Sequence, residues 1–298
     1  MPEILDDPSN QQEIQQILDQ VYPVLNDPSS SYYLPTFIRS NGYDPYNVTS
    51  PWTWNLNDAT TLKTAGSACL DIAADDENYP CTVATNAYIL DPTVMPVLKL
   101  TQVSLQGFSN AHSERPVCQS DGVTIIQTVD FSTLGPPQPA QVTITGNFEL
   151  DLNCCCSQDK LSCLPSTSSQ YKGTGTFLAT IPSSSVTITY SITDLAPNVL
   201  TIAVSKVVLN VPNGQGGLPN IQVTVHILSA GDVQAFNNLA NEAFNSAAGL
   251  DTILANTQTF LNTADALQLF GKIVTDEVDG YLRANHDYPF NNPSLSII

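Results

Sequence analysis

Polar and apolar residues alternate along much of the chain from about residue 97 onward, with the period of two that is typical of β-strands. The alternation is clearest at residues 142–152, where the apolar positions are Val142, Ile144, Phe148, Leu150 and Leu152. It returns at residues 186–192 and 221–227, and in weaker form at 123–131 and 173–181. Strands with one apolar and one polar face are typical of antiparallel sheets, so we expect these segments to pair in that way.

In two further segments, the apolar side chains change from one face of the strand to the other partway along. At residues 98–105 the apolar positions are first even-numbered and then odd-numbered, and at 200–211 the same change follows Val204. A β-bulge produces this change because one extra residue shifts the phase of the strand. Long strands with bulges predict a strongly curved sheet.

Helical periodicity begins close to the start of the chain. Residues 10–22 place apolar side chains at i, i+3, i+4 and i+7, which are Ile14, Ile17, Leu18 and Val21. Ser9 and Gln12 form the pattern of a capping box, and Pro23 is expected to end the helix.

Two more helices are predicted after the last strand. Asp232 opens the first, which Gly249 is expected to close, and the second begins near Asn262. With about 20 residues, the second helix would be roughly 30 Å long. Its apolar stripe consists of Ala264, Leu267, Phe270, Val274, Val278 and Tyr281. The order of elements predicts an α+β fold, in which a long, strongly curved antiparallel β-sheet wraps around the long C-terminal helix.

The chain changes character at about residue 95. Residues 26–95 are rich in Pro, Asn, Asp, Ser and Tyr, have weak periodicity, and contain Trp52 and Trp54. These aromatic residues are typical of an ordered irregular segment and not of a flexible linker. We therefore expect residues 1–95 to form an N-terminal helix with an irregular segment, and residues 96–298 to form the sheet-and-helix domain.

The charge balance narrows the choice of partners. Nine Lys and Arg against 28 Asp and Glu give a net charge of −19, although charged residues are only 12% of the chain. A protein this acidic repels phosphate backbones, so nucleic acid is not expected as a partner, and anionic membranes are disfavoured for the same reason. The polar faces of the predicted strands are mostly Thr, Ser and Asn, which favours a neutral hydrophobic ligand over a charged one.

The cysteines leave the redox compartment open. The chain has seven, and an odd number requires a free thiol or an intermolecular bridge. Their spacing fits no zinc site. Closing the short loop between the first two would stabilise the fold by roughly 3 kcal/mol, but reduced thiols are equally compatible with the sequence. The disulfide candidates are Cys69, Cys81, Cys118, Cys154, Cys155, Cys156 and Cys163. Residues 1–7 lack the features of a secretory signal, and an extracellular location is favoured over a cytoplasmic one.

No pattern of catalytic residues occurs in the sequence, so we do not expect an enzyme, a cofactor or a metal centre. His112, His226 and His286 are expected to be solvated, and so is the acidic run at residues 75–77. The glycine-rich segment 213–217 lies between two predicted strands and is expected to close a hairpin. No apolar run reaches the length that spans a bilayer as a helix.

The predicted arrangement resembles one half-module of the tubular lipid-binding (TULIP) superfamily, which includes juvenile-hormone-binding and takeout proteins and mite group 7 allergens. The resemblance rests on the strand and turn at residues 103–110, the strand at 145–150, the Gly-x-Gly strand at 172–175 and the long C-terminal helix. It implies a long apolar groove between the sheet and the helix that holds a lipid or another hydrophobic small molecule. The groove residues expected on this basis are Leu267, Phe270, Val274, Val278, Tyr281, Phe148, Leu150, Val223 and Val225.

Two other functions fit the sequence. A membrane-acting toxin, insecticidal or pore-forming, would explain the strands rich in Ser and Thr and the scarcity of Lys and Arg, and it would contact membranes. A structural or surface interaction module would use the aromatic segment 32–37 with Trp52 and Trp54 as its contact surface. A binding protein for hydrophobic molecules is favoured because small residues on the long helix and curved strands tend to enclose space.

Overall fold

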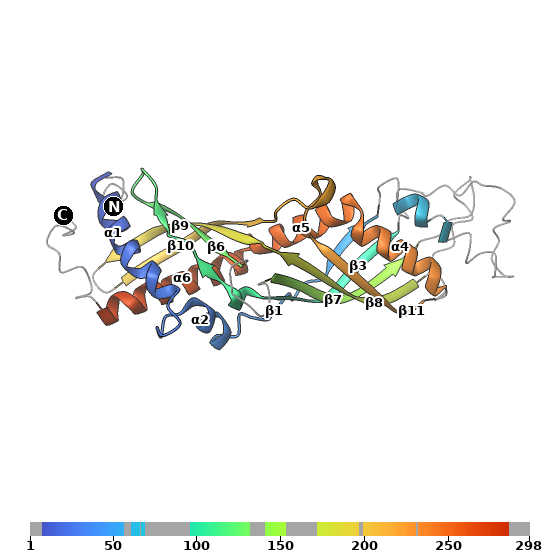
Figure 1. The fold of residues 1–298 in the computed structure, drawn as a ribbon, viewed down its shortest axis with the longest axis horizontal. Helices are drawn as coiled ribbons and strands as arrows, with labels where there is room; N and C mark the ends of the chain where they lie inside the picture. The colour runs from blue at the N-terminus through green and yellow to red at the C-terminus, as the bar shows by residue number, and fades with distance from the viewer. Residues whose placement is uncertain are drawn as a thin grey trace, which may run out of the picture.

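The structure is a computed structural model. It describes residues 8–56, 61–65, 67–68, 96–131, 141–152, 172–196, 199–230 and 232–285. The described residues form an elongated molecule in which two antiparallel sheets follow one another along the long axis, with helices lying against them (Figure 1). The predicted α+β class and the long C-terminal helix are confirmed.

The first sheet has six strands. Four of them lie in the order β3, β7, β8 and β11, and two short strands, β1 and β2, both pair with β3. Their bounds are Tyr46–Asn47 for β1, Trp52–Asn55 for β2, Val97–Gln106 for β3, Gln141–Asp151 for β7, Lys172–Pro182 for β8 and Gln222–Ser229 for β11. The pairing of β3 with β7 shifts between Thr101 and Ser104, so the expected bulge is confirmed.

The second sheet has five strands, in the order β10, β9, β6 and β4, with β5 also paired to β6. Their bounds are His112–Ser113 for β4, Val117–Cys118 for β5, Thr124–Asp130 for β6, Ser185–Ala196 for β9 and Val199–Asn210 for β10. The pairing of β9 with β10 shifts between Val204 and Lys206, where the sequence predicts a bulge.

The chain passes between the two sheets four times, from β3 to β4, from β6 to β7, from β8 to β9 and from β10 to β11. From β8 it enters β9 through a tight turn at Ser183, whose φ is +56°, and the backbone N–H of Phe131 donates to the carbonyl of Ser184 there. From β10 it enters β11 through residues 213–217, which contain the short 3-10 helix η3 (Gln215–Gly217). Because β10 and β11 belong to different sheets, this glycine-rich segment is a crossover and the expected hairpin is wrong.

The main helices and one 3-10 turn lie over the sheets. Their bounds are Pro8–Leu25 for α1, Leu34–Ser40 for α2, Phe108–Asn110 for the 3-10 turn η1, Val233–Asn245 for α4, Ala247–Leu261 for α5 and Ala264–Asn285 for α6. Helix α1 continues through Pro23 instead of ending there. The helix ends at Leu25, two residues after Pro23.

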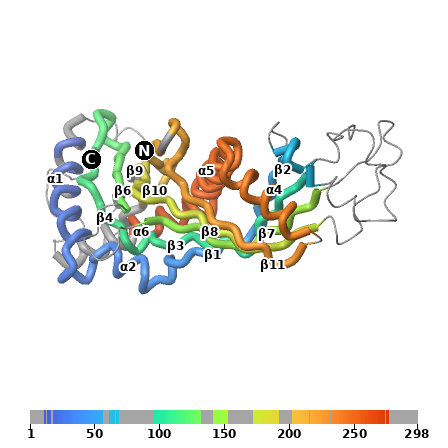
Figure 2. Tube along the Cα trace, turned by 45° about the vertical axis from the view of Figure 1, so that its right-hand side comes forward, coloured from blue at the N-terminus to red at the C-terminus, as the bar shows by residue number. Residues whose placement is uncertain are grey.

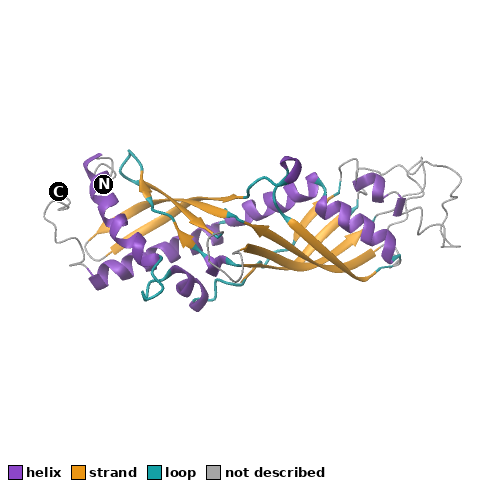
Figure 3. Ribbon diagram, in the orientation of Figure 1, coloured by secondary structure: helices purple, strands orange, loops and turns teal. Residues whose placement is uncertain are grey.

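The helices divide between the sheets. Helix α4 lies against β11 of the first sheet, α6 runs along β10 of the second, and α5 joins the two (Figures 1 and 3). Helix α1 packs beside β4 and β5 at the end of the second sheet, as the turned view in Figure 2 also shows. The long C-terminal helix therefore follows one sheet, while α4 covers the other.

Residues 8–56 share the same hydrophobic core as the rest of the chain. Leu25, Leu34 and Leu56 are buried in one continuous cluster with the strands, and β1 and β2 extend the first sheet. The domain boundary expected at residues 95 and 96 borders residues 69–95, which lie outside the described part, and it stays a prediction.

None of the helices in the described part of the chain is long and apolar enough to cross a membrane. The same residues contain no group of three or more His, Cys, Asp or Glu side chains placed to hold a metal ion. His112 and His226 are exposed, as expected, whereas His286 and the acidic run at residues 75–77 fall outside the described residues.

Candidate functional site

An apolar pocket of about 100 Å³ lies inside the half of the molecule that contains the second sheet. Helices α1, α2, α5 and α6 and strands β1, β6 and β9 contribute its walls. The helices provide Leu18, Val21, Leu25, Leu34, Ile38, Phe260, Leu261, Ala266, Leu269, Phe270 and Val274. The strands and loops provide Tyr43, Tyr46, Phe108, Ala111, Pro116, Gln127, Val129, Phe131, Val186, Ile188 and Tyr190. None of these lining residues is charged.

The walls follow from the periodicity of each element. In α1, Leu18, Val21 and Leu25 lie on one face because they are spaced by three and four residues. In the sheet, alternate residues of β6 and β9 point to the same face, so Val129 pairs with Val186 directly across the strands. The pocket forms where the apolar face of this sheet meets the apolar faces of the helices.

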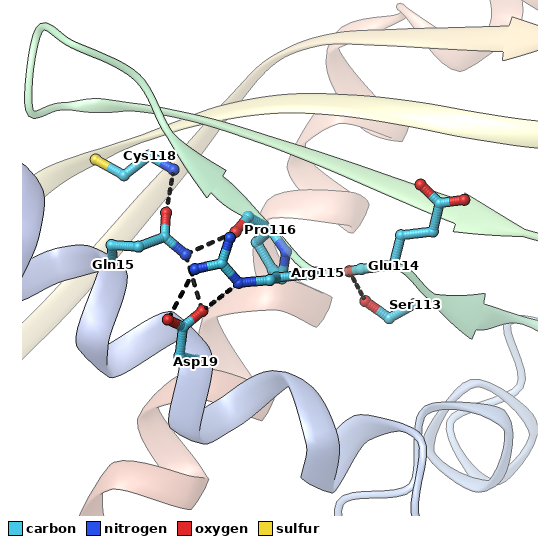
Figure 4. Close-up of polar contacts among 7 residues, drawn as sticks. All are labelled: Gln15, Asp19, Ser113, Glu114, Arg115, Pro116 and Cys118. Atoms are coloured by element: carbon cyan, nitrogen blue, oxygen red, sulfur yellow. Dashed lines mark hydrogen bonds and ion pairs between the residues drawn. The ribbon is translucent and has the colours of Figure 1, made fainter.

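Helix α1 is attached to the end of the second sheet by side-chain amides that bind the backbone of residues 113–118. The Gln15 side-chain oxygen accepts from the backbone N–H of Cys118 at 2.8 Å, and its nitrogen donates to the carbonyl of Pro116 at 3.0 Å (Figure 4). Asn26 forms the same kind of pair with the backbone of Ser113, at 2.9 Å and 2.7 Å. Each amide therefore replaces the two backbone groups that a neighbouring strand would offer.

An exposed ion pair adds to this attachment. Arg115 donates two hydrogen bonds to the carboxylate of Asp19, at 2.7 Å and 2.8 Å (Figure 4). These bonds, and a further one from Gln15, lower the pKa of Asp19 below its usual value of 3.8. A carboxyl group whose pKa is lower in the folded state than in the unfolded state stabilises the fold at pH values above its unfolded-state pKa. This contribution is lost as the pH falls through the folded-state pKa. Because both side chains are exposed, the contribution is small.

The pocket has two polar side chains on adjacent strands of its sheet wall. Gln127 of β6 is buried, and its side-chain nitrogen donates to the hydroxyl of Ser113 at 2.7 Å. Tyr190 of β9 is 1% exposed, and burial raises the pKa of its hydroxyl far above the usual value, so the group stays neutral. Tyr190 pairs with Ile125 and Gln127 pairs with Ile188, so the two polar residues are diagonal neighbours on one face.

A second, open groove of about 770 Å³ lies beside the pocket, between β10 and α6. The helix comes close to the strand at Gly271, where a Cβ atom would lie 3.3 Å from the carbonyl oxygen of Ile202. Tyr46 and Leu269 line both the pocket and the groove, so their side chains stand between the two spaces.

The groove residues expected from the sequence fall into two groups. Phe270 and Val274 line the pocket, and Leu267 lines the neighbouring groove. Val278 and Tyr281 follow on α6, and their side chains lie outside what the structure describes.

The strand residues of that expectation lie in the other half of the molecule. Phe148 and Leu150 are each 1% exposed in the first sheet, where the ring of Phe148 contacts that of Phe244 from α4. Val223 and Val225 are half-buried on β11, the strand that α4 covers. Among the described residues, therefore, the expected set does not meet in one cavity. The sequence did not predict that α1, α2, β6 and β9 line the pocket. Gln127 was a signal for β6, because it is a polar residue at an apolar position of the alternation in residues 123–131.

Cys118 is a free, buried thiol in the structure. Burial is the main cause that raises its pKa, and the nearby carboxylate of Asp121 acts in the same direction. The thiol therefore stays protonated at neutral pH and is a poor nucleophile. The other six disulfide candidates, Cys69, Cys81, Cys154, Cys155, Cys156 and Cys163, lie outside the described residues.

Comparison with known proteins yields similarity in structure only. No family model and no curated protein matches the sequence. Takeout 1 of Epiphyas postvittana is similar in structure, with 14% identity, a TM-score of 0.29, and coverage of 78% of this chain and 91% of that one. A lipopolysaccharide binding protein has 12% identity and a TM-score of 0.32, with 80% of this chain and 42% of that chain covered. Latherin has 13% identity and a TM-score of 0.18, with 95% and 97% covered.

Proposed function

We propose that this protein is a non-enzymatic carrier that holds a lipid or another hydrophobic small molecule between the second sheet and helices α1, α2 and α6. The observation that carries the proposal is an interior pocket whose lining residues are almost all aliphatic or aromatic and include no charge. Such a lining recognises a ligand by removing its apolar surface from water, which is worth roughly 25 cal/mol per Å². Convergent catalytic groups are not needed for this task.

The size of the pocket sets a condition on the ligand. Its 100 Å³ is smaller than a cavity of about 150 Å³ that holds benzene in another protein. A longer molecule must therefore displace part of the wall. Tyr46 and Leu269 separate the pocket from the groove along β10, and both are half-buried. Rotation of these two side chains would join the two spaces into one site that is large enough for an acyl chain.

The proposal is tested with a matched pair of substitutions on α6. Val274→Trp puts a large side chain into the pocket, whereas Ala264→Trp puts the same side chain at the exposed start of α6, where it lines neither the pocket nor the groove. We expect Val274→Trp to weaken binding of the fluorescent probe N-phenylnaphthylamine by about tenfold or more, and Ala264→Trp to change it less than about threefold. Fluorescence titration of both purified variants measures this.

A second experiment asks whether the protein carries a ligand when it is isolated. Solvent extraction of the purified protein followed by mass spectrometry should recover a hydrophobic molecule in near-stoichiometric amount, and Val274→Trp should recover less. If the wild-type protein neither yields such a molecule nor binds the probe, the carrier function is wrong.

The structure also bears on the interaction-module alternative. Leu34 and Pro35 of the aromatic segment are buried, and Trp54 is half-buried with its ring against that of Phe244 at 5.6 Å. These residues contribute to the hydrophobic core and leave less apolar surface for a partner. The toxin alternative stays a prediction that liposome leakage would test.

A further inference from the structure

We infer that the pocket selects an uncharged hydrophobic ligand that carries a hydrogen-bonding oxygen, and that Gln127 and Tyr190 recognise this oxygen. The inference rests on the proposed carrier function and adds the chemical class of the ligand. Its starting point is a break in the pattern of β6. Ile125, Gln127 and Val129 all point inward and are buried, and only the middle residue is polar.

Burying a side-chain amide in an apolar wall is costly. A buried polar group that lacks hydrogen bonds destabilises a protein by about 1–3 kcal/mol. One N–H of Gln127 is satisfied by the hydroxyl of Ser113, but an amide has two donors and a carbonyl oxygen. An apolar side chain at this position would fill the wall without any such cost. The amide of Gln127 must therefore have a role other than packing.

Tyr190 provides the second half of the recognition. Its side chain lines the same pocket, and its register places it diagonally across from Gln127 on the neighbouring strand. Side chains in this relation are about 7–8 Å apart at their Cα atoms and can contact one another when they are long. A hydroxyl both donates and accepts, and Gln does the same. One ligand oxygen between them can therefore bind both side chains.

The absence of charge among the described lining residues excludes an ionised ligand group. A carboxylate or phosphate moved into this pocket would lose its hydration and meet no Lys or Arg. An alcohol, ketone or ester oxygen loses far less hydration and gains the two hydrogen bonds. The group that Gln127 and Tyr190 bind is therefore predicted to be the oxygen of a hydrophobic alcohol, ketone or ester, and not a carboxylate or a phosphate.

Three probes with the same chain length test this inference by displacing N-phenylnaphthylamine at pH 7. They are decanol, chlorodecane, in which chlorine replaces the hydroxyl, and decanoate, which is ionised. A neutral hydrogen bond is worth about fivefold in affinity. We expect decanol to bind at least about fivefold more tightly than chlorodecane, and decanoate to bind most weakly of the three.

The residues are tested by Gln127→Met and Tyr190→Phe, which keep the size of each side chain and remove its hydrogen-bonding group. Each should reduce the preference for decanol over chlorodecane to less than about twofold while leaving the affinity for chlorodecane within about threefold. Ser113→Ala is the control, because it removes the same internal hydrogen bond but keeps the amide of Gln127. A purely structural role of Gln127 would weaken both probes equally, in Gln127→Met and in Ser113→Ala alike.

The outcomes separate this inference from the carrier function. If decanol, chlorodecane and decanoate displace the probe equally well, the carrier function stands and the selection of an uncharged oxygen is wrong. The same conclusion follows if both variants keep the wild-type preference. If the wild-type protein binds no probe at all, the proposed function itself fails.

Discussion

At the scale of single residues, aromatic rings determine where glycine is required. Gly173 and Gly175 form the Gly-x-Gly pattern of β8, and a Cβ atom at either position would collide with a ring. At Gly173 the ring is that of Phe236, 2.3 Å away, and at Gly175 it is that of Phe148, 2.6 Å away. The glycines therefore leave space for two aromatic side chains that fill the core of the first sheet.

Phe244 of α4 is the centre of this aromatic cluster. It is fully buried, and its ring contacts those of Phe148, Phe177 and Trp54 at centroid distances of 5.5, 5.4 and 5.6 Å. Each such pair adds to the stability that burial alone provides. The contacts join α4, β2, β7 and β8, so one side chain connects four elements.

We predict that Phe244→Ala lowers the free energy of unfolding by about 3–5 kcal/mol, because it leaves a cavity that surrounding rings cannot fill. Phe260→Ala is the control, since Phe260 is half-buried and its ring contacts the ring of Tyr46 at a centroid distance of 5.3 Å. Urea denaturation of both variants measures the difference. An equal decrease in the free energy of unfolding of the two variants would show that the cluster around Phe244 contributes no more to stability than the contact of Phe260 does.

At the scale of elements, α5 is the helix that the sequence pattern missed, because most of it lies between the helix expected to end at Gly249 and the one expected to begin near Asn262. A single helix was expected to end at Gly249, whereas α4 ends at Asn245 and Ser246 caps α5 by accepting from the backbone N–H of Gly249. A Cβ atom at Gly249 would lie 1.8 Å from the carbonyl oxygen of Ala243. The absence of a side chain at Gly249 allows α4 and α5 to meet closely. The glycine therefore does not end a helix, as the sequence suggested, but permits the contact between two helices.

Helix α5 also covers the edge of the second sheet. Asn262, which follows α5, accepts from the backbone N–H of Val207 at 3.0 Å and donates to the carbonyl of the same residue at 2.7 Å. Gln258 accepts from the N–H of Leu209 at 2.8 Å and also donates to the carbonyl of Val207. An edge strand with free backbone groups invites pairing with other chains, and these amides prevent it.

We predict that Gln258→Ala and Asn262→Ala each lower the free energy of unfolding by about 1–3 kcal/mol, because each leaves backbone groups of β10 without a partner. Amide hydrogen exchange at Val207 should become faster in Asn262→Ala, and at Leu209 in Gln258→Ala. Asn241→Ala is the control, because Asn241 is exposed and its side chain donates to its own helix. Unchanged exchange at both amides would contradict the role assigned to the two side chains.

At the scale of the whole molecule, the two halves differ in how their interiors are filled. The first sheet closes on α4 with aromatic rings, whereas the second sheet leaves a pocket against α1, α2 and α6. Helix α1 closes that pocket largely through side-chain amides bound to residues 113–118. The half with the pocket is therefore the one in which a ligand would add missing contacts.

We predict that saturating N-phenylnaphthylamine slows hydrogen exchange in α1, β6, β9 and the first half of α6, and leaves β7, β8 and β11 within about twofold of their rates without ligand. Binding to the folded state at one hundred times the dissociation constant stabilises it by about 2.7 kcal/mol. The elements that line the pocket should show this most strongly. Hydrogen exchange followed by mass spectrometry measures it, and equal protection of both halves would place the ligand elsewhere.

The period-two alternation was sufficient to predict the long strands and both bulges, and helical periodicity was sufficient to predict the helix that begins at Asp232 and the long C-terminal helix. These features depend on neighbours in the sequence, since the phase of a strand or the face of a helix is set by spacing alone. Only the tertiary structure decided that the strands divide into two sheets, because which strands pair depends on contacts between residues far apart in the chain.

The same distinction applies to the candidate site. The sequence by itself placed Phe270 and Val274 on an apolar stripe, and it determined an acidic chain whose composition is unsuited to binding phosphates. It could not distinguish these residues from Phe148 and Leu150, because all four are apolar members of amphipathic elements. Packing against Phe244 assigns Phe148 to a filled core, and packing against α1 assigns Phe270 to a pocket. Burial in one or the other depends on how distant faces meet, and this is decided only when the chain folds.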